Sequence, residues 1–291
     1  MNVALPAFER SGNRLRALRP LMVSKTAYAS LLCNGDGYAT GVEVLGKSLE
    51  LAGSTIPRVV MVTADVGAEA RDRLKRLGWL LRDVQPIGVP NSDQPLYPRF
   101  SAVFTKLRAW QLCEFERIVF LDADTLVLKN IDALFERKHF AAAPDFFMPD
   151  RFNSGVMVLE PSEVTFAEMM QALPLTATYD GGDQGFLNSY FSNWYGMSIE
   201  QRLPVGMNMP HFIYQFMRGH PGLNATLEHE AKVVHYMLQK PWLANVNLTG
   251  GSEIWWNLYV AAYPEKASSW RHRIHAFEDW TFDHLERMLL G

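Results

Sequence analysis

Through residues 27–125, short apolar segments alternate with helical segments, and this alternation limits the choice of fold more than any other feature. Four apolar runs are predicted to be buried strands, at residues 27–35, 58–65, 79–88 and 117–124. Three segments with helical spacing separate them, at residues 38–53, 67–78 and 104–116. Strands and helices in this order build a parallel sheet with helices on both faces. The sequence therefore predicts an α/β, Rossmann-like fold with a mainly parallel central sheet.

The remainder of the chain alternates less regularly. Strands are expected at residues 152–162 and 231–238, and helices at residues 165–173, 183–194 and 252–263. No internal repeat and no linker-like change of composition divides the chain. We therefore expect one domain over residues 27–291, in two halves that meet near residue 125, after an N-terminal extension at residues 1–26.

Composition excludes several classes of protein. A net charge of −3, with no long block of Lys and Arg, argues against nucleic-acid binding. No apolar run approaches the roughly 20 residues of a transmembrane helix, so no membrane span is expected. Cys33 and Cys113 are too few for a disulfide framework, and we expect both to be small buried core residues. This cysteine usage suits a reducing compartment, which predicts a cytoplasmic protein.

Two aspartates one residue apart end the apolar run at residues 117–124. Asp122 and Asp124 thus fall at the carboxyl end of a predicted strand, where α/β sheets bind their ligands. Two carboxylates this close repel unless a cation lies between them, and hard oxygen ligands suit Mg²⁺ or Mn²⁺. The alternative is that one aspartate caps a turn and the other is solvated, because a D-x-D motif is short and occurs by chance.

Six segments, in order, resemble those of glycosyltransferase family 8, the retaining enzymes that include glycogenin and galactinol synthase. They are TKLRAW (105–110), FLDADTLVLKNIDALFE (120–136), AAAPD (141–145), FNSGVMV (152–158), DGGDQGFLN (180–188) and AKVVHYMLQKPW (231–242). The resemblance implies a single-domain nucleotide-diphospho-sugar transferase fold of the GT-A type. Residues 27–125 would then be the nucleotide-binding half and residues 126–291 the sugar and acceptor half. It also implies Mn²⁺, with Mg²⁺ as the alternative, and transfer of a hexose from UDP-glucose or UDP-galactose with retention.

The same resemblance implies roles for single residues. The metal ligands would be Asp122, Asp124 and His235; without its QKPW context, His235 would more often be a core histidine. The catalytic residues would be Asp183, Gln184 and Lys106. The nucleotide would be bound by Leu31, Cys33, Asn34, Tyr38, Ala123 and Lys240, and the sugar by Asp145, Asn153, Ser154 and Asp180.

Several of these roles have a simpler alternative. Asp180 or Asp183 could be the N-cap of the following helix, because Asp is a preferred capping residue. Asp183 could act as a nucleophile, as in retaining glycosidases, or the acceptor could attack from the front face. Between His235 and Lys240 the family's glycine is missing, which leaves open how closely the backbone approaches the diphosphate.

The acceptor half has diverged further from the family. Tyr214 falls near the tyrosine that glycogenins glucosylate, so a self-glucosylating primer is one alternative, and a packed aromatic residue is the other. A Trp-Trp pair, Trp255 and Trp256, resembles family members that act on a separate acceptor, although such residues are usually core. A UDP-sugar-binding protein without activity is a third hypothesis. The sequence identifies no particular hydroxyl acceptor, and it is compatible with a homodimer.

Overall fold

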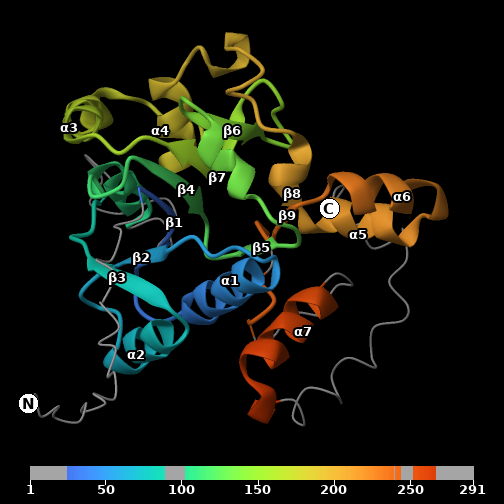
Figure 1. Cartoon of the computed structure of the whole chain (residues 1–291). Coiled ribbons are helices and arrows are strands. Elements are labelled where there is room, and N and C mark those ends of the chain that lie inside the picture. Colours follow the sequence, from blue (N-terminus) through green and yellow to red (C-terminus); the bar gives the residue numbers. More distant parts are fainter. Residues whose placement is uncertain (1–24, 89–101, 239, 244–251, 267–291) are drawn as a thin grey trace, which may run out of the picture.

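The computed structural model describes residues 25–88, 102–238, 240–243 and 252–266. In these parts of the chain, a six-stranded sheet has the order β3-β2-β1-β4-β7-β6, and a three-stranded sheet has the order β5-β9-β8 (Figure 1). The larger sheet is mainly parallel and has helices on both faces, as predicted. The smaller sheet was not expected from the sequence.

The parallel part of the large sheet contains the four predicted strands. They are β1 (Thr26–Leu32), β2 (Arg58–Val62), β3 (Trp79–Asp83) and β4 (Arg117–Leu121). Each ends earlier than the apolar run that predicts it. After β1, Asn34 and Gly35 both have positive φ, and after β2 the amide of Val66 closes a turn onto the carbonyl of Thr63. Turn geometry therefore ends these strands before their apolar residues run out.

The two faces of the sheet build two cores. On one face Tyr28, Val60 and Val119 pack with α1 (Ala39–Leu51) and α2 (Ala68–Arg76). Their neighbours along the strands point the other way, and the opposite face packs with η2 (Val103–Gln111), α3 (Glu163–Ala172) and α4 (Asp183–Tyr190). Strands covered on both faces explain why their sequences are nearly all apolar.

The helix expected at residues 104–116 is shorter and tighter than predicted. It is the 3₁₀ helix η2, which ends at Gln111. Phe104, Leu107 and Trp110, three residues apart, are 2%, 0% and 2% exposed. Since a 3₁₀ helix has three residues per turn, this spacing places all three on one face against the sheet.

Two antiparallel strands complete the large sheet. β7 (Phe152–Leu159) pairs with β4, and β6 (Ala141–Pro144) pairs with β7. Because β7 runs opposite to β4, its first residues lie beside the carboxyl end of β4. This pairing brings the segment FNSG next to the two aspartates.

The small sheet joins segments far apart in the chain. It consists of β5 (Thr125–Val127), β8 (Met209–Pro210) and β9 (Val233–His235), so the strand expected at residues 231–238 belongs here and not to the central sheet. Helix α7 (Ser252–Ala262) packs on α1 and on this sheet (Figure 1). Trp255 and Trp256 are 0% and 5% exposed, which confirms them as core residues.

The remaining elements are short helices between the strands. Two of them, α5 (His211–Gly219) and α6 (Pro221–Glu230), pack on one another beside β8 and β9 (Figure 1). The other helical turns are η3 (Asp132–Glu136), η4 (Leu173–Leu175), η5 (Trp194–Gly196), η6 (Val205–Met207) and η7 (Pro264–Lys266). Among the described residues, no helix is both long and apolar enough to cross a bilayer.

The prediction for the cysteines was wrong. Cys33 is only partly buried and Cys113 is exposed. Cys33 lies in the loop after β1, and Cys113 lies in the turn after η2, where its Sγ is 3.6 Å from the carbonyl oxygen of Trp110. Each cysteine lies just after the end of a buried element, β1 or η2, and the apolar sequence pattern predicted both elements to be longer than they are.

Candidate functional site

Backbone pairing fixes the position of both aspartates. The amide of Asp122 donates to the carbonyl of Gly155 on β7 at 2.9 Å, and Thr125 closes a turn onto the carbonyl of Asp122. On the other side, the amide of Tyr236 donates to the carbonyl of Asp124 at 2.9 Å. The D-x-D turn is therefore held between the large and the small sheet.

A late histidine completes a possible metal site. β5 and β9 pair antiparallel with Thr125 opposite His235, which brings the imidazole to Asp124. One ligand atom each from Asp122, Asp124 and His235 lies within 4.8 Å of the others. These three side chains, all in the described part of the chain, can thus bind one cation together.

The hydrogen bonds of His235 test whether a cation fits. Asn208 donates through Nδ2 to Asn153, so its Oδ1 accepts from Nδ1 of His235 at 2.9 Å. Nε2 lies 3.2 Å from Oδ1 of Asp124: a protonated ring donates to this oxygen, whereas a neutral ring offers Nε2 as a lone pair to a cation shared with Asp124. A lone pair and a carboxylate oxygen repel unless a cation lies between them. This is the donor arrangement that a metal-bound histidine requires.

The two carboxylates are in different electrostatic surroundings. Burial alone would raise the pKa of Asp124, but Lys240 and His235 hold it below its usual range, and Lys240 contacts Oδ2 directly. Burial raises the pKa of Asp122, and the Asp124 carboxylate adds to the effect, against the lowering influence of Lys106. A divalent cation would favour the ionised form of both.

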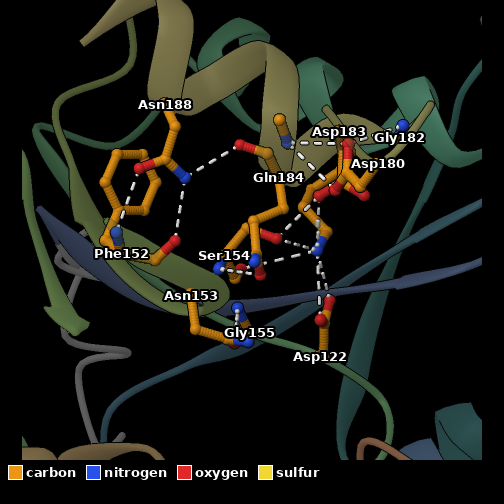
Figure 2. A network of polar contacts seen from close by, with 12 residues as sticks. Asp122, Phe152, Asn153, Ser154, Gly155, Asp180, Gly182, Asp183, Gln184 and Asn188 are labelled. Carbon is orange, nitrogen blue, oxygen red and sulfur yellow. Dashed lines mark hydrogen bonds and ion pairs between the residues drawn. The ribbon is translucent and has the colours of Figure 1, made fainter. Parts of the chain in front are cut away.

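A second group of polar side chains, which includes Asp122, Ser154 and Asp183 (Figure 2), surrounds Lys106. Its ammonium lies 2.9 Å from Oδ1 of Asp122 and 2.8 Å from Oδ2 of Asp183, and it donates to Oγ of Ser154 at 3.1 Å. Burial would lower its pKa, but Asp122 and Asp183 raise it above the ordinary value, so it stays charged. Ser154 also donates to Asp183 at 2.8 Å. The structure thus brings the predicted catalytic lysine and aspartate together with one predicted metal ligand.

Neither of the two aspartates considered is the N-cap residue of α4, although one of them accepts hydrogen bonds from its first turn. Asp180 accepts the backbone N–H groups of Gly182 and Gly185 at 2.9 to 3.1 Å, while the N-cap residue is Gly182. Asp183 is the first residue of the helix, and its carboxylate contacts Lys106 and Ser154 instead (Figure 2). Capping therefore leaves Asp183 available for chemistry.

A row of amides and carboxylates extends from the histidine to the start of α4. Asn153 donates to Oδ2 of Asp145 at 3.0 Å, and Gln184 donates to the same oxygen at 3.2 Å. Oε1 of Gln184 accepts the backbone amide of Ser154 at 3.2 Å (Figure 2). Asp145 and Asn153 are 5% and 7% exposed, so their conformations are fixed by these bonds. Hydroxyl-rich ligands suit such alternating donors and acceptors.

Sequence reasoning missed two residues of this row. Asn208, 2% exposed, joins His235 to Asn153 through the bonds given above. The available signal was an amide between the apolar residues Met207 and Met209, since a buried Asn needs polar partners. Gly155 is the other. An added Cβ there would lie 2.2 Å from Cε1 of His235, so only glycine lets the ring pack against β7.

The predicted nucleotide residues lie around the loop after β1. Leu31 and Cys33 are partly buried, Asn34 is exposed with φ of 59°, and burial raises the pKa of the Cys33 thiol to about 11. Tyr38 is 39% exposed, and its ring packs edge-on against Trp242 at 5.4 Å. Nζ of Lys240 lies 5.9 Å from the Tyr38 ring.

Trp242 also fixes this loop to the D-x-D turn. Its indole N–H donates to the carbonyl of Gly37 at 2.8 Å. A Cβ at Gly41 would meet the carbonyl oxygen of Ala123 at 2.4 Å and the Trp242 ring at 2.7 Å. The structure therefore brings the loop, Ala123 and the KPW segment together, with glycine required at the closest approach.

Tyr214 belongs to the packing of the small sheet and α7. It is partly buried in the middle of α5, against the apolar cluster that includes Leu126, Val234 and Trp255. The structure thus supports the packed-aromatic interpretation of this residue.

The sequence profile described as "Glycosyl transferase family 8" matches residues 30–246, more than half of the chain. Glycogenin-1 of Mus musculus is 39% identical over 224 residues, covering 74% of this chain and 65% of that protein. Glycogenin-1 of Caenorhabditis elegans is 35% identical over 268 residues, covering 84% and 61%. The chain thus spans less than two thirds of the length of these curated relatives.

Solved structures agree on the fold. The galactosyltransferase LgtC, in complex with donor and acceptor sugar analogs, superposes with a TM-score of 0.60 at 20% identity, over 84% of this chain and 99% of that chain. The apo-form glycosyltransferase GlyE of Streptococcus pneumoniae TIGR4 gives a TM-score of 0.58 at 22% identity, over 84% and 64%. The chain therefore belongs to glycosyl transferase family 8, as a glycogenin-like member with the GT-A fold.

Proposed function

We propose that this protein is a metal-dependent, retaining hexosyltransferase that moves a sugar from a UDP-sugar to a hydroxyl acceptor. The observation that carries the proposal is the convergence of Asp122, Asp124 and His235 beside the buried Lys106–Asp183 pair. A site for a divalent cation and a positioned carboxylate next to it are the two parts that diphosphate departure requires.

The metal would be held by the two aspartates and the histidine. Mixed oxygen and nitrogen ligands favour Mn²⁺ modestly over Mg²⁺. When bound, the metal would neutralise negative charge on the two phosphates. Lys240 and Lys106 supply fixed positive charge on either side of the proposed metal site. Each lysine is 9% exposed or less, so solvent screens its charge little.

Asp183 is proposed to act at the anomeric carbon. Its carboxylate is 6% exposed and is oriented by Lys106 and Ser154, so it is fixed before a ligand arrives. Negative charge at this point stabilises an oxocarbenium-like centre, whether Asp183 forms a covalent intermediate or assists front-face attack. Asp145, Asn153 and Gln184 supply the hydrogen-bond partners for sugar hydroxyls.

The acceptor is proposed to be a separate molecule. A self-glucosylating tyrosine must bring its phenol oxygen within about 3 Å of a proton acceptor in the sugar site. Tyr214, on α5, packs against an apolar cluster, and it would have to leave that packing before it could reach the sugar site. This supports a separate acceptor over a primer on Tyr214.

The test is release of UDP from UDP-glucose, UDP-galactose and UDP-glucuronate, with Mn²⁺ and with a chelator, followed by the intact mass of the protein. We expect release from at least one donor that stops with the chelator, and no hexose increments on the protein. Increments that disappear in Tyr214→Phe would establish a primer instead. Absence of release with every donor would leave a UDP-sugar-binding protein as the better interpretation.

A further inference from the structure

A buried asparagine to which no ligand has been assigned lies beside the histidine of the proposed metal site. Asn208 comes between η6 and β8, and β8 pairs with β9 so that Pro210 lies opposite His235. The start of β9 is also tied to η6, because the amide of Lys232 donates to the carbonyl of Gly206 at 2.8 Å. Backbone contacts on both sides therefore hold the Asn208 side chain next to the imidazole.

The direction of the hydrogen bonds around Asn208 is fixed by groups whose polarity is constant. Oδ2 of the Asp145 carboxylate accepts from Nδ2 of Asn153 at 3.0 Å. The backbone amide of Gly155, which can only donate, donates to Oδ1 of Asn153 at 2.9 Å (Figure 2). The side chain of Asn153 therefore has one orientation, with its oxygen on the side of Gly155 and Asn208.

This orientation is passed on to the histidine. Because Oδ1 of Asn153 is an acceptor, the group of Asn208 that faces it is Nδ2, which donates at 2.8 Å. Oδ1 of Asn208 is then the atom beside Nδ1 of His235, at 2.9 Å. An amide oxygen in this place needs a hydrogen on Nδ1. We call Asn153 and Asn208 the amide relay.

The position of that hydrogen decides what the other ring nitrogen can do. A neutral ring with its hydrogen on Nε2 would donate to Oδ1 of Asp124, 3.2 Å away, and two of the proposed metal ligands would then satisfy one another. A neutral ring with its hydrogen on Nδ1 presents Nε2 as a lone pair instead. The first tautomer competes with a cation, and the second can bind one.

We propose that Asn208 is a positioning residue of the metal site, because it sets the tautomer of His235. Through the amide relay, the polarity of the Asp145 carboxylate reaches the imidazole and keeps Nε2 unprotonated. All four side chains of this chain of bonds are buried, so water does not readily replace any of them. The inference rests on the proposed function, since it takes a cation to be bound beside Asp124.

The simpler alternative is that Asn208 only satisfies polar groups between η6 and β9. Its loss would then lower stability without selecting a tautomer. Stability, tautomer and metal affinity must therefore be measured separately, with variants that change them differently.

The experiment reads the His235 ring in the metal-free protein and the Mn²⁺ affinity in a second measurement. Long-range ¹H–¹⁵N correlation NMR of histidine-labelled protein in mildly alkaline buffer shows which ring nitrogen carries the hydrogen, and His235→Gln identifies the signals. Electron paramagnetic resonance gives the Mn²⁺ affinity in the presence of UDP. For the wild-type protein we expect the hydrogen on Nδ1 and one bound Mn²⁺ per chain.

Two substitutions of Asn208 separate the alternatives. Asn208→Leu has a similar size and removes both side-chain bonds, so the hydrogen should move to Nε2 and the Mn²⁺ affinity should fall about 10–100-fold. Asn208→Asp keeps an acceptor for Nδ1, but it loses the donor to Asn153 and buries a charge. Its melting temperature should fall, while the hydrogen stays on Nδ1 and Mn²⁺ binding is retained.

Asn188→Leu is the matched control. The Asn188 side chain also joins two elements, because it bonds to the backbone amide and carbonyl of Phe152 and to the carbonyl of Gln184. We expect a lower melting temperature in Asn188→Leu, with the tautomer of His235 and the Mn²⁺ affinity unchanged.

Three results would overturn the inference: a hydrogen on Nε2 in the wild-type protein, an unchanged tautomer and Mn²⁺ affinity in Asn208→Leu, or an equal loss of affinity in Asn188→Leu. Failure of the proposed function looks different. A wild-type protein that binds no Mn²⁺, but whose tautomer changes in Asn208→Leu, retains the role of Asn208 and removes the metal. Mn²⁺ binding that does not depend on Asn208 does the reverse.

Discussion

The two ends of the site are built by different means. At the metal end, Asp124, His235 and Lys240 are 7%, 4% and 9% exposed, and the Asp124 carboxylate contacts both of the other side chains. At the end beside Asp145, Phe146 and Phe147 are 43% and 53% exposed, and the turn that carries them is held by the amides of Phe147 and Met148, which donate to Oδ1 of Asp145. The first end is set by charge compensation between buried groups, and the second by the shape of a turn.

This difference predicts how each end responds to substitution. Removal of one member of a buried charge cluster leaves the others unpaired, and the loss of binding or activity is large. Removal of an exposed ring loses only its own contacts with a ligand. Substitutions at the metal end should therefore act through the metal and the diphosphate, whereas those at Phe146 and Phe147 should remove only the contacts of the exposed ring.

The largest effect is expected for Asp124→Asn. Loss of a metal ligand should reduce metal-dependent UDP release to background, because a bound cation contributes several kcal/mol of charge stabilisation. Asp83→Asn is the matched control, since Asp83 also ends a parallel strand but pairs with Arg71 at 2.7 Å on the surface. Release that survives in Asp124→Asn would exclude Asp124 as a metal ligand.

Asp183→Asn should lower turnover by on the order of 10²–10⁴, as for other positioned charges in active sites. Asp180 keeps its bonds to the first turn of α4, but the substitution removes the charge that pairs with the buried Lys106, so the melting temperature should fall as well. UDP release under saturating donor, together with a thermal melt, checks both parts. A destabilised protein with unchanged turnover would show that Asp183 serves only the fold.

The first half of the fold and the D-x-D turn were predictable because local patterns determine them. Apolar runs identify strands, and a pair of aspartates after a strand indicates a ligand site. The position of His235 could not be derived from its own strand, because that strand pairs with β5, which is only three residues long. The resemblance to the family identified His235 as a metal ligand, and the pairing of β5 with β9 explains its position beside Asp124.

Other features of the site could not be predicted from the sequence, for physical reasons. Asn208 becomes part of the site through contacts with residues 55 and 27 positions away, which no local pattern encodes. The choice of Asp180 over Asp183 as the cap depends on a turn in which Gly181 has φ of 69°. The exposure of Phe146 and Phe147 could not be predicted, because phenylalanines taken alone resemble core residues.

Gly155→Ala should weaken metal binding by about 10–100-fold, as is usual when groups that position a metal ligand are changed. The added methyl would meet His235 at 2.2 Å and displace the ring from Asp124. Gly219→Ala, where nothing lies within 4 Å of the added atom, is the control. Equal Mn²⁺ affinity in both variants would show that His235 is not a ligand.

The smallest effect is expected for Asp180→Ala. It removes the bonds to the amides of Gly182 and Gly185, and loss of a helix cap costs about 1 kcal/mol. For a domain of this size, that corresponds to a melting temperature lower by about 2–4 °C. A thermal melt beside Asp183→Asn is the measurement. An unchanged melting temperature in Asp180→Ala would show that Asp180 does not cap α4.

The central claim is that Asp122, Asp124 and His235 form one metal site for a nucleotide diphosphate. The most direct measurement is electron paramagnetic resonance of Mn²⁺ titrated with the protein in the presence of UDP, since free Mn²⁺ gives a signal that binding removes. We predict one bound Mn²⁺ per chain in the wild-type protein and in Asp83→Asn, and loss of that binding in Asp124→Asn and in His235→Ala. Equal binding in the wild-type protein and in both site variants would contradict the account.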